Sequence, residues 1–482
     1  MTEGTQNSPR TAALNAGSSH IRLSLKEKIG YSVGDTASNL FFQTFMLFLL
    51  YFYTDVVGLE AAAIGTLFLV TRIWDAVNDP VMGTIADRTK TRWGKFRPYL
   101  VWCAIPFGII GVLLFTSPDF DPAGKLIYAY ITYNLMMMAY TAINVPYSAL
   151  MAVITPNSLE RTELSSFRFV AAFVGGLIVQ GGTLSLVKYF GGENEALGWQ
   201  WTMACISGLA VFLFLITFLS TKERVSPPSD QRSDFWRDLK DLFKNRPWLM
   251  IGAATVFQLI FIVMRNSSVL YYFKYYVKDQ QLNLFGNIID LSFEGFSSSF
   301  LTTGMIVTIL GAILAKWFAK KLDKRNTYAG FLIIAAVANS FFYIIQPQDV
   351  LAIYILNIVF SFAVGPVSVL QWAMYTDTAD YAEWKQGRRA TGLLMAASLF
   401  ALKLGLTLGG AIVAWVLAYY GFVANQEQSA EVLSGIVLLM SLYPAVFGII
   451  GGLIMIVYPL TNKTMSKIEE DLAARRLGTV GG

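Results

Sequence analysis

The segment TRIWDAVNDP at residues 71–80 places charged and amide side chains inside an apolar run that is long enough to cross a lipid bilayer. Asp75 and Asp79 stand four residues apart, and Arg72 and Asn78 lie on nearly the same face of a helix, just before Pro80. Ionisable groups within a membrane helix are costly to bury and therefore indicate a functional site. Two carboxylates beside an amide suit a small, hard cation.

The composition predicts a membrane protein rather than a soluble enzyme. Of the 482 residues, 55% are hydrophobic and only 14% are charged. Apolar segments of about 20 residues recur along the chain, each long enough to span the hydrocarbon core as a helix. The two cysteines lie far apart in apolar segments, and the single histidine, His20, lies in a polar tail. We therefore expect no cofactor, disulfide framework or buried histidine proton relay.

The predicted fold class is an all-α membrane protein with twelve transmembrane helices in two groups of six. The spans are predicted at 29–53, 61–86, 99–116, 126–151, 167–189 and 201–220, and then at 248–276, 300–319, 328–346, 351–375, 392–420 and 433–459. A polar linker with two prolines and alternating charges separates the groups. The predicted parts are an N-terminal tail (1–25), a six-helix bundle (26–220), the linker (221–247), a second bundle (248–459) and a C-terminal tail (460–482).

The loop charges predict the orientation of these spans. The loop at 87–98 is short and dense in Lys and Arg, which the positive-inside rule assigns to the cytoplasm. This assignment places both tails and the linker in the cytoplasm and the protein in the plasma (inner) membrane. The loop at 278–294 then lies outside and is long enough to hold a short interfacial helix, while the tail after Leu460 is expected to be partly helical.

Four stretches carry a resemblance to a known family. They are YTDVVGL at 53–59, RIWDAVNDP at 72–80, RWGKFRP at 92–98 and DTADY at 377–381. Together they resemble the sugar–cation symporters of the glycoside–pentoside–hexuronide family, which includes the melibiose carrier, and the resemblance covers residues 25–459. It implies a major facilitator fold, with two six-helix bundles around a central cavity, and sugar uptake by alternating access driven by sodium or protons.

The resemblance also implies the coupling-ion site. The matching cation-binding residues are Asp75, Asn78, Asp79 and Thr141. Sodium at Asp75 and Asp79 is favoured over a proton, because the amide and hydroxyl add neutral oxygens to the carboxylates. The alternative is an internal ion-pair network with Arg72 and Lys403 that only neutralises charge. Both can hold, because a cation and the lysine could compete for the same carboxylates at different stages of transport.

The predicted substrate-binding residues lie on several spans. They are Asn39, Arg72, Tyr140, Asn144, Arg168, Gln371, Trp372 and Lys403. The chain departs from the family pattern where Asn39 and Asn144 replace two acids, although amides still hydrogen-bond hydroxyls as donors and acceptors. The alternatives are helix-packing contacts for Tyr140 and Asn144, an anchor at the cytoplasmic end for Arg168, and core packing for Trp372.

A set of charged residues near the cytoplasmic ends is predicted to gate the transporter. Ion pairs there would latch the cytoplasmic side in one state without binding substrate. The predicted gating residues are Asp87, Arg88, Arg92, Asp377, Asp380, Arg388 and Arg389. The basic loop that holds Arg88 and Arg92 needs only a topological explanation, so we expect no nucleic-acid partner.

The leading functional hypothesis is secondary symport of a glycoside, pentoside or hexuronide by a monomer in the bilayer. The alternatives are a lipid or lysolipid transporter on the same fold, and a sugar sensor that does not transport. A polar cavity favours the first of these. Because two acids are replaced, Arg168 and Lys403 are expected to be less neutralised, which motivates the hypothesis of a substrate with a carboxylate or sulfonate; neutral pentosides are favoured over it.

The predicted topology can be tested with single cysteines. Ser229→Cys lies in the predicted cytoplasmic linker and Gly286→Cys in the predicted external loop. An impermeant thiol reagent added to intact cells should label Gly286→Cys and not Ser229→Cys. The reverse labelling pattern would overturn the orientation.

Overall fold

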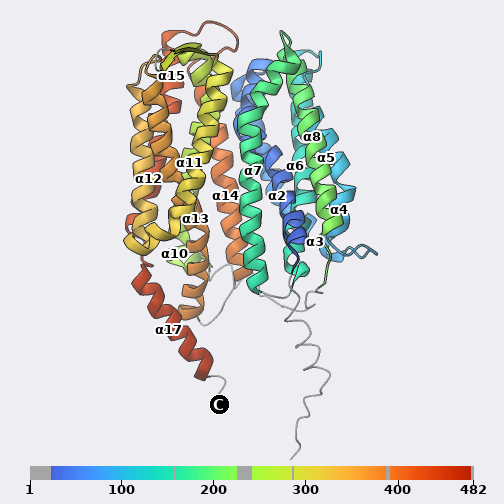
Figure 1. The fold of residues 1–482 in the computed structure, drawn as a ribbon, viewed down its shortest axis with the longest axis vertical. Coiled ribbons are helices and arrows are strands. Elements are labelled where there is room, and N and C mark those ends of the chain that lie inside the picture. The colour runs from blue at the N-terminus through green and yellow to red at the C-terminus, as the bar shows by residue number, and fades with distance from the viewer. Residues whose placement is uncertain (1–22, 156–157, 225–241, 285–286, 387–390, 479–482) are drawn as a thin grey trace, which may run out of the picture.

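The computed structural model describes residues 23–155, 158–224, 242–284, 287–386 and 391–478, and these are almost entirely helical. Two groups of helices stand side by side along the long axis of the molecule (Figure 1). We call them the N-terminal half (α2 to α8) and the C-terminal half (α10 to α16). Much of the predicted linker lies outside the described residues.

The N-terminal half begins with a long helix that ends in a π-helical turn. Its elements are α2 (Leu25–Tyr51), η1 (Phe52–Val56), α3 (Ala61–Arg88), α4 (Arg97–Trp102), α5 (Ala104–Leu114), α6 (Pro122–Ile154), α7 (Ser158–Gly191) and α8 (Glu195–Ser220). The third predicted span is divided into α4 and α5 at Cys103. Pro106 explains this break, because it has no N–H to donate to the carbonyl four residues earlier.

The C-terminal half repeats this pattern. Its elements are α10 (Arg246–Tyr271), η2 (Tyr272–Val277), α11 (Phe293–Leu322), α12 (Lys324–Ser340), η3 (Phe341–Tyr343), α13 (Val350–Gln386), α14 (Thr391–Tyr419), α15 (Ala430–Met440) and α16 (Leu442–Ile456). The first helix again ends in a π-helical turn, η2. The last span is divided at Ser441 because Pro444 removes one helical hydrogen bond. The predicted helical tail is confirmed as α17 (Asn462–Gly478).

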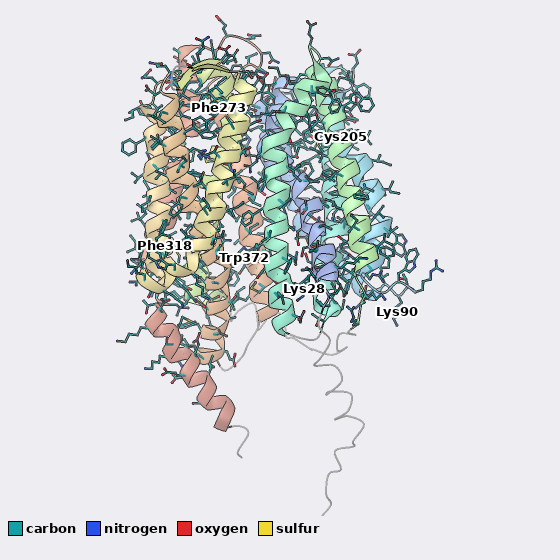
Figure 2. All side chains as sticks on the ribbon, viewed as in Figure 1. Lys28, Lys90, Cys205, Phe273, Phe318 and Trp372 are labelled. Atoms are coloured by element: carbon teal, nitrogen blue, oxygen red, sulfur yellow. The ribbon has the colours of Figure 1, made fainter. Side chains whose placement is uncertain are left out.

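The predicted spans agree with the helices of the structure, although several helices are longer. In the described ranges, eight helices are long and apolar enough to cross a membrane. Within α3 the described apolar stretch is Ala61–Arg72, and Asp75 and Asp79 follow it on the same helix. Large apolar side chains are exposed in both halves, and Cys205 on α8 is exposed as well (Figure 2). A wide exposed apolar surface is what a lipid-facing protein requires.

The loop after η2 contains two strands. The loop has room for a short interfacial helix, but the structure has a two-stranded antiparallel hairpin there, β1 (Gln280–Leu284) and β2 (Asn287–Leu291). Two segments of five residues are too short for a stable helix but sufficient for paired strands.

Among the described residues, three pairs of helices make most of the contact between the two halves. α2 packs on α10, α3 on α14, and α7 on α11. Within the N-terminal half, α7 and α8 approach closely at two glycines: a β-carbon added at Gly198 would lie 2.2 Å from the Val187 carbonyl oxygen and 3.0 Å from Gly191 Cα. Small residues at such contacts let helix backbones come together in a membrane.

Gly198→Ala is therefore expected to destabilise the protein. The added methyl group meets backbone rather than a movable side chain, and overpacking of this kind costs about 1–3 kcal/mol. Gly208→Ala on the same helix is the matched control, since a β-carbon there meets nothing within 4 Å. Thermal melting of the two purified variants in detergent checks the prediction, and equal melting temperatures would contradict it.

Candidate functional site

A cluster of carboxylates and cations joins α3 of the N-terminal half to α14 of the C-terminal half. The Lys403 ammonium lies 3.1 Å from Asp75 Oδ2 and also bonds Asp79 Oδ2. Thr141 Oγ1 on α6 lies 3.1 Å from Asp75 Oδ1 and 2.9 Å from Asp79 Oδ1. The Asp75 side chain is 5% exposed and that of Asp79 is 32% exposed. One hydroxyl proton cannot serve both carboxylates at once, so the site has spare acceptor capacity.

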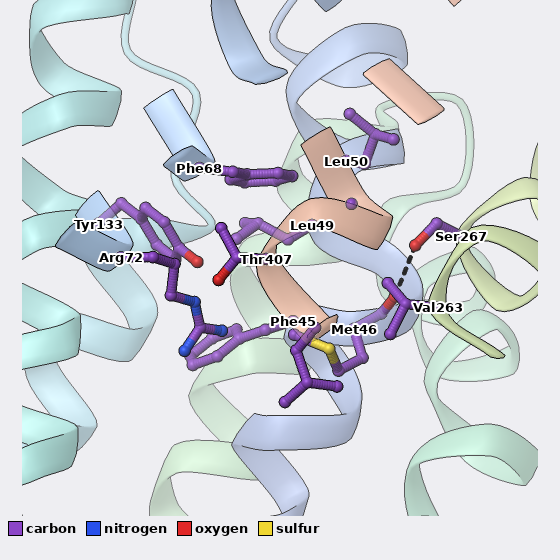
Figure 3. A pocket seen from close by; sticks show the side chains of 12 residues that line it. Phe45, Met46, Leu49, Leu50, Phe68, Arg72, Tyr133, Val263, Ser267 and Thr407 are labelled. Atoms are coloured by element: carbon purple, nitrogen blue, oxygen red, sulfur yellow. Dashed lines mark hydrogen bonds between the residues drawn. The ribbon is translucent and has the colours of Figure 1, made fainter. Parts of the chain in front are cut away.

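Arg72 completes the charge balance of this cluster. Its Nη1 lies 3.6 Å from Asp75 Oδ2. Figure 3 shows its side chain extending past Tyr133 towards Phe45, with Thr407 of α14 nearby, around a small pocket. The pocket holds only about 20 Å³, which is room for one water molecule and not for a sugar. Two carboxylates therefore face two cations in this state, and an added metal ion would be in excess unless a cation moves away.

The fourth predicted cation ligand, Asn78, is half-buried on α3. The described hydrogen bonds do not join its side chain to Asp75, Asp79 or Thr141. Among the described residues, no group of three or more His, Cys, Asp or Glu side chains could hold a metal ion. The structure thus brings three of the four predicted residues together, and the role of Asn78 stays a prediction.

A second ion pair lies inside the N-terminal half and was missed by the sequence analysis. Arg168 on α7 forms a two-pronged contact with Asp35 on α2, with Nε 2.5 Å from Oδ2 and Nη2 3.0 Å from Oδ1. The Tyr147 hydroxyl donates to Asp35 Oδ2 at 2.6 Å, and the guanidinium lies 5.0 Å from the centre of that tyrosine ring. Asp35 stands inside the first predicted span, one turn before Asn39. An acid inside a membrane span is the sequence feature that could have predicted this ion pair.

This pair changes the interpretation of Arg168. α7 begins at Ser158, so Arg168 lies well inside the helix and not at its end. Both side chains are mostly buried, with 21% of Arg168 and 15% of Asp35 exposed. Since Lys403 is paired as well, the expectation that Arg168 and Lys403 are poorly neutralised is wrong. The two positions where amides replace acids do not determine the local charge, because Asp35 stands one turn before Asn39.

The two amides lie on the same wall as this pair. Asn39 Nδ2 donates to the Asp35 carbonyl at 3.0 Å, and Asn144 Nδ2 donates to the Tyr140 carbonyl at 3.0 Å. Ser38 Oγ joins the two helices by donating to Asn144 Oδ1 at 2.5 Å. Tyr140 is half-buried beside Phe107, with 6.2 Å between the ring centres. α2, α6 and α7 therefore bring these predicted substrate residues onto one polar wall.

The predicted substrate residues of the C-terminal half are placed differently. Gln371 on α13 is buried. Trp372 packs against the hydrophobic core of its own half, and its ring lies 6.2 Å from that of Tyr375. Core packing, the alternative weighed for Trp372, agrees with these contacts, and a sugar contact at either residue remains a prediction.

The two halves are also tied at the end of the molecule remote from the C-terminus (Figure 1). The Asp55 side chain on η1 is fully buried, and Lys274 Nζ on η2 lies 2.8 Å from its Oδ1. The Tyr275 hydroxyl also donates to Asp55 Oδ1, and Asn425 Nδ2 donates to the Asp55 carbonyl at 2.5 Å. The π-helical turns at the ends of α2 and α10 thus meet in one buried polar contact, which we call the outer cluster.

The predicted gating residues lie at the opposite end. Arg88 and Arg92 are exposed, and the Arg92 guanidinium lies 5.1 Å from the Trp93 ring centre. Asp377 pairs with Lys324 of its own half at 2.7 Å, and Asp380 also has a partner. The Asp87 side chain and the predicted residues Arg388 and Arg389 lie outside the described residues. Neither Arg92 nor Asp377 reaches the other half through these contacts.

Known proteins match this chain over nearly its whole length. A family model described as MFS/sugar transport protein matches residues 30–462. The chain is 37% identical over 453 residues to the inner membrane symporter YicJ of Escherichia coli (strain K12), covering 94% of this chain and 95% of the relative. It is 38% identical over 457 residues to YagG of that strain, provisionally named a glycoside/cation symporter, with 94% and 96% covered. A glucuronide carrier protein homolog of that strain is 30% identical over 460 residues, with 94% and 97% covered.

The fold has solved counterparts. A mutant of the nucleoside transporter NupG superposes with a TM-score of 0.66, covering 90% of this chain and 99% of that chain, at 12% identity. A likeness at that identity shows the fold alone. The chain therefore belongs to the MFS/sugar transport protein family and has the twelve-helix major facilitator fold, which confirms the predicted fold class and the resemblance. It is a multi-pass cation symporter of the inner membrane, and the prediction of a transporter rather than an enzyme is confirmed.

Asp35→Asn is expected to destabilise the N-terminal half, because it leaves the Arg168 guanidinium facing a neutral amide. Removing one partner of a buried ion pair costs on the order of 3 kcal/mol. Glu294→Gln is the control, since it breaks an exposed pair with Lys188 that should contribute little.

The double variant Asp35→Asn with Arg168→Gln should recover part of the lost stability, with a coupling of about 0.5–3 kcal/mol. Thermal melting of the purified wild type, the two single variants Asp35→Asn and Arg168→Gln, and the double variant measures this coupling. Strictly additive losses would show that the two side chains do not stabilise each other.

Proposed function

We propose that the protein is a secondary active transporter that carries a glycoside, pentoside or hexuronide together with sodium or a proton by alternating access. The main observation in support is that Lys403 of the C-terminal half forms ion pairs with Asp75 and Asp79 of the N-terminal half. A coupling-ion site that also joins the two halves can link ion binding to their relative movement.

Asp75 and Asp79 are two adjacent carboxylates, which are costly to bury together. They cannot both stay ionised in an apolar bundle without positive charge nearby. Lys403 supplies that charge in the described state, and its side chain is 31% exposed, so it has room to leave. A cation that binds Asp75 and Asp79 replaces the ammonium and frees Lys403 for the substrate. The ion thereby changes both the contact between the halves and the substrate site.

Sodium is the favoured ion and a proton is the runner-up. The Thr141 hydroxyl already contacts both carboxylates and supplies a neutral oxygen. Asn78 precedes Asp79 on α3, and a rotation of its side chain could add a second. A cage of hard oxygens suits a small metal ion, whereas a proton needs only one carboxylate oxygen.

The polar wall of α2, α6 and α7 supports a hydroxylated substrate. Asn39, Asn144 and the Asp35–Arg168 pair offer donors and acceptors side by side. The names of YagG and of the glucuronide carrier homolog agree with a sugar. A lipid or lysolipid substrate would require an apolar wall, which this face does not provide.

The outer cluster supports alternating access. With the orientation expected from the loop charges, both termini are cytoplasmic and the buried Asp55–Lys274 contact lies at the external end. The halves are then closed towards the outside in this state. Opening to the outside would break this contact. The cytoplasmic side would then be closed by the predicted latch, which consists of Asp87, Arg88, Arg92, Asp377, Asp380, Arg388 and Arg389. We expect the protein to transport its substrate as a monomer.

Asp79→Asn is expected to uncouple transport. The variant should lose the effect of sodium on sugar affinity, typically worth about 1–3 kcal/mol or about 5–150-fold, and should no longer accumulate sugar uphill. Downhill exchange should persist, because the wall of Asn39, Asn144 and Arg168 is unchanged. Uptake into proteoliposomes, with sodium and proton gradients imposed separately over a panel of sugars, measures both effects.

The matched control for this experiment is Asp290→Asn, which removes an exposed carboxylate from the hairpin. It should keep wild-type coupling. An Asp79→Asn protein that still concentrates sugar under a sodium gradient would show that Asp79 is only a member of an ion-pair network.

A further inference from the structure

Among the described residues, the acids of the sites above pair with cations, whereas the buried Arg265 faces no carboxylate. Asp35 faces Arg168, Asp55 faces Lys274, and the Asp75–Asp79 pair faces two cations. Arg265 on α10 is 3% exposed, and its contacts among the described residues include no carboxylate. A guanidinium stays charged even when buried, so this unmatched positive charge needs a reason.

Neutral groups orient the guanidinium. Nε donates to Asn339 Oδ1 at 3.1 Å, Nη1 to Asn266 Oδ1 at 3.4 Å and Nη2 to Asn357 Oδ1 at 2.6 Å. The Phe360 ring centre lies 3.9 Å away. These partners use three of the five N–H groups and fix the plane of the fork. They add no negative charge, so the cation is held in place but not neutralised.

Arg265 lines a cavity of about 130 Å³ at the contact between the halves. Gln43 from α2 and Gln180 from α7 line it from the N-terminal side, and Asn357 and Ser361 from the C-terminal side. The described hydrogen bonds give neither glutamine side chain a partner, although Gln180 is only 7% exposed. Gln43 stands one turn beyond Asn39 on α2, so the cavity continues the polar wall of the proposed substrate site.

We propose that Arg265, with Gln43 and Gln180, binds the carboxylate or sulfonate of an acidic sugar. This inference rests on the proposed function and narrows its substrate class. A planar carboxylate fits the guanidinium fork, a sulfonate offers a third acceptor, and the free glutamine amides donate to either. The anion would supply the negative charge that the described contacts of Arg265 lack. Arg168 and Lys403, the cations first considered for such an anion, are already paired with acids, whereas Arg265 is not paired with one among the described residues.

A bracing role for Arg265 is the competing explanation. Asn339 also donates to the carbonyls of Met440 and Ser441 at 2.9 Å, at the break between α15 and α16, so the amide cluster does join helices. Bracing accounts for the hydrogen bonds but not for the choice of a charged residue, because burying an unmatched cation is costly. The two explanations predict different selectivity: a brace affects all sugars alike, whereas an anion site affects only acidic ones.

The test compares methyl β-glucuronide with methyl β-glucoside, which differ at one carboxylate. Calorimetric titration of the purified wild-type protein in sodium should show tighter binding of the glucuronide by about tenfold or more, as a buried charge-assisted contact implies. Arg265→Gln should abolish this preference and leave glucoside binding within about twofold of wild type. Arg265→Lys, which keeps the charge but loses the fork, should retain part of it. Arg325→Gln, near the tail helix, is the matched control.

Several outcomes would overturn the inference. A wild-type protein that binds the glucoside as tightly as the glucuronide rejects it without any variant. Equal loss of both ligands in Arg265→Gln favours the brace, and if that variant does not fold, Gln180→Ala must still reduce the preference for the glucuronide. Sodium-driven uptake of glucoside without an anion preference rejects only this inference. If no sugar of the panel is bound and none is taken up under a cation gradient, both this inference and the proposed function are rejected.

Discussion

The need to neutralise charge in an apolar bundle organises the interior of this protein. An ionised side chain in a low-dielectric environment is stable only with an opposite charge and hydrogen bonds close by. Asp35, Asp55, Asp75 and Asp79 each meet a cation on a different helix, as in Asp35–Arg168 and Asp75–Lys403. These ion pairs therefore also stabilise the tertiary structure, because each one holds two helices together.

These pairs have different mechanical consequences. Asp35–Arg168 lies within one half and holds α2 against α7, which keeps the polar wall rigid. Lys403 and Lys274 instead reach from the C-terminal half to carboxylates of the N-terminal half. Under the alternating access proposed above, a pair that crosses between the halves stabilises one state and is broken in another, so a change of charge at such a contact would shift the populations of the states.

Local chain chemistry explains where the helices depart from uniform spans. Pro106 and Pro444 divide two spans because each removes a backbone donor, and each proline stands three residues after the break. α7 and α13 extend beyond their predicted ends because polar turns continue each helix. The spans were predicted from apolar residues, so these polar turns were not included. The hairpin between η2 and α11 was missed since strand pairing depends on two segments together.

The sequence by itself determined the spans, their grouping into two halves, the family and the carboxylate pair, because each depends on residues close in the chain. Asp75 and Asp79 are one helical turn apart whatever the rest of the protein does. Only the tertiary structure decided which cation meets which acid: Arg168 and Asp35 are 133 residues apart, and the packing of α2 on α7 brings them together. The isolation of Arg265 was equally invisible, because a residue can be recognised as unpaired only once all of its neighbours are known.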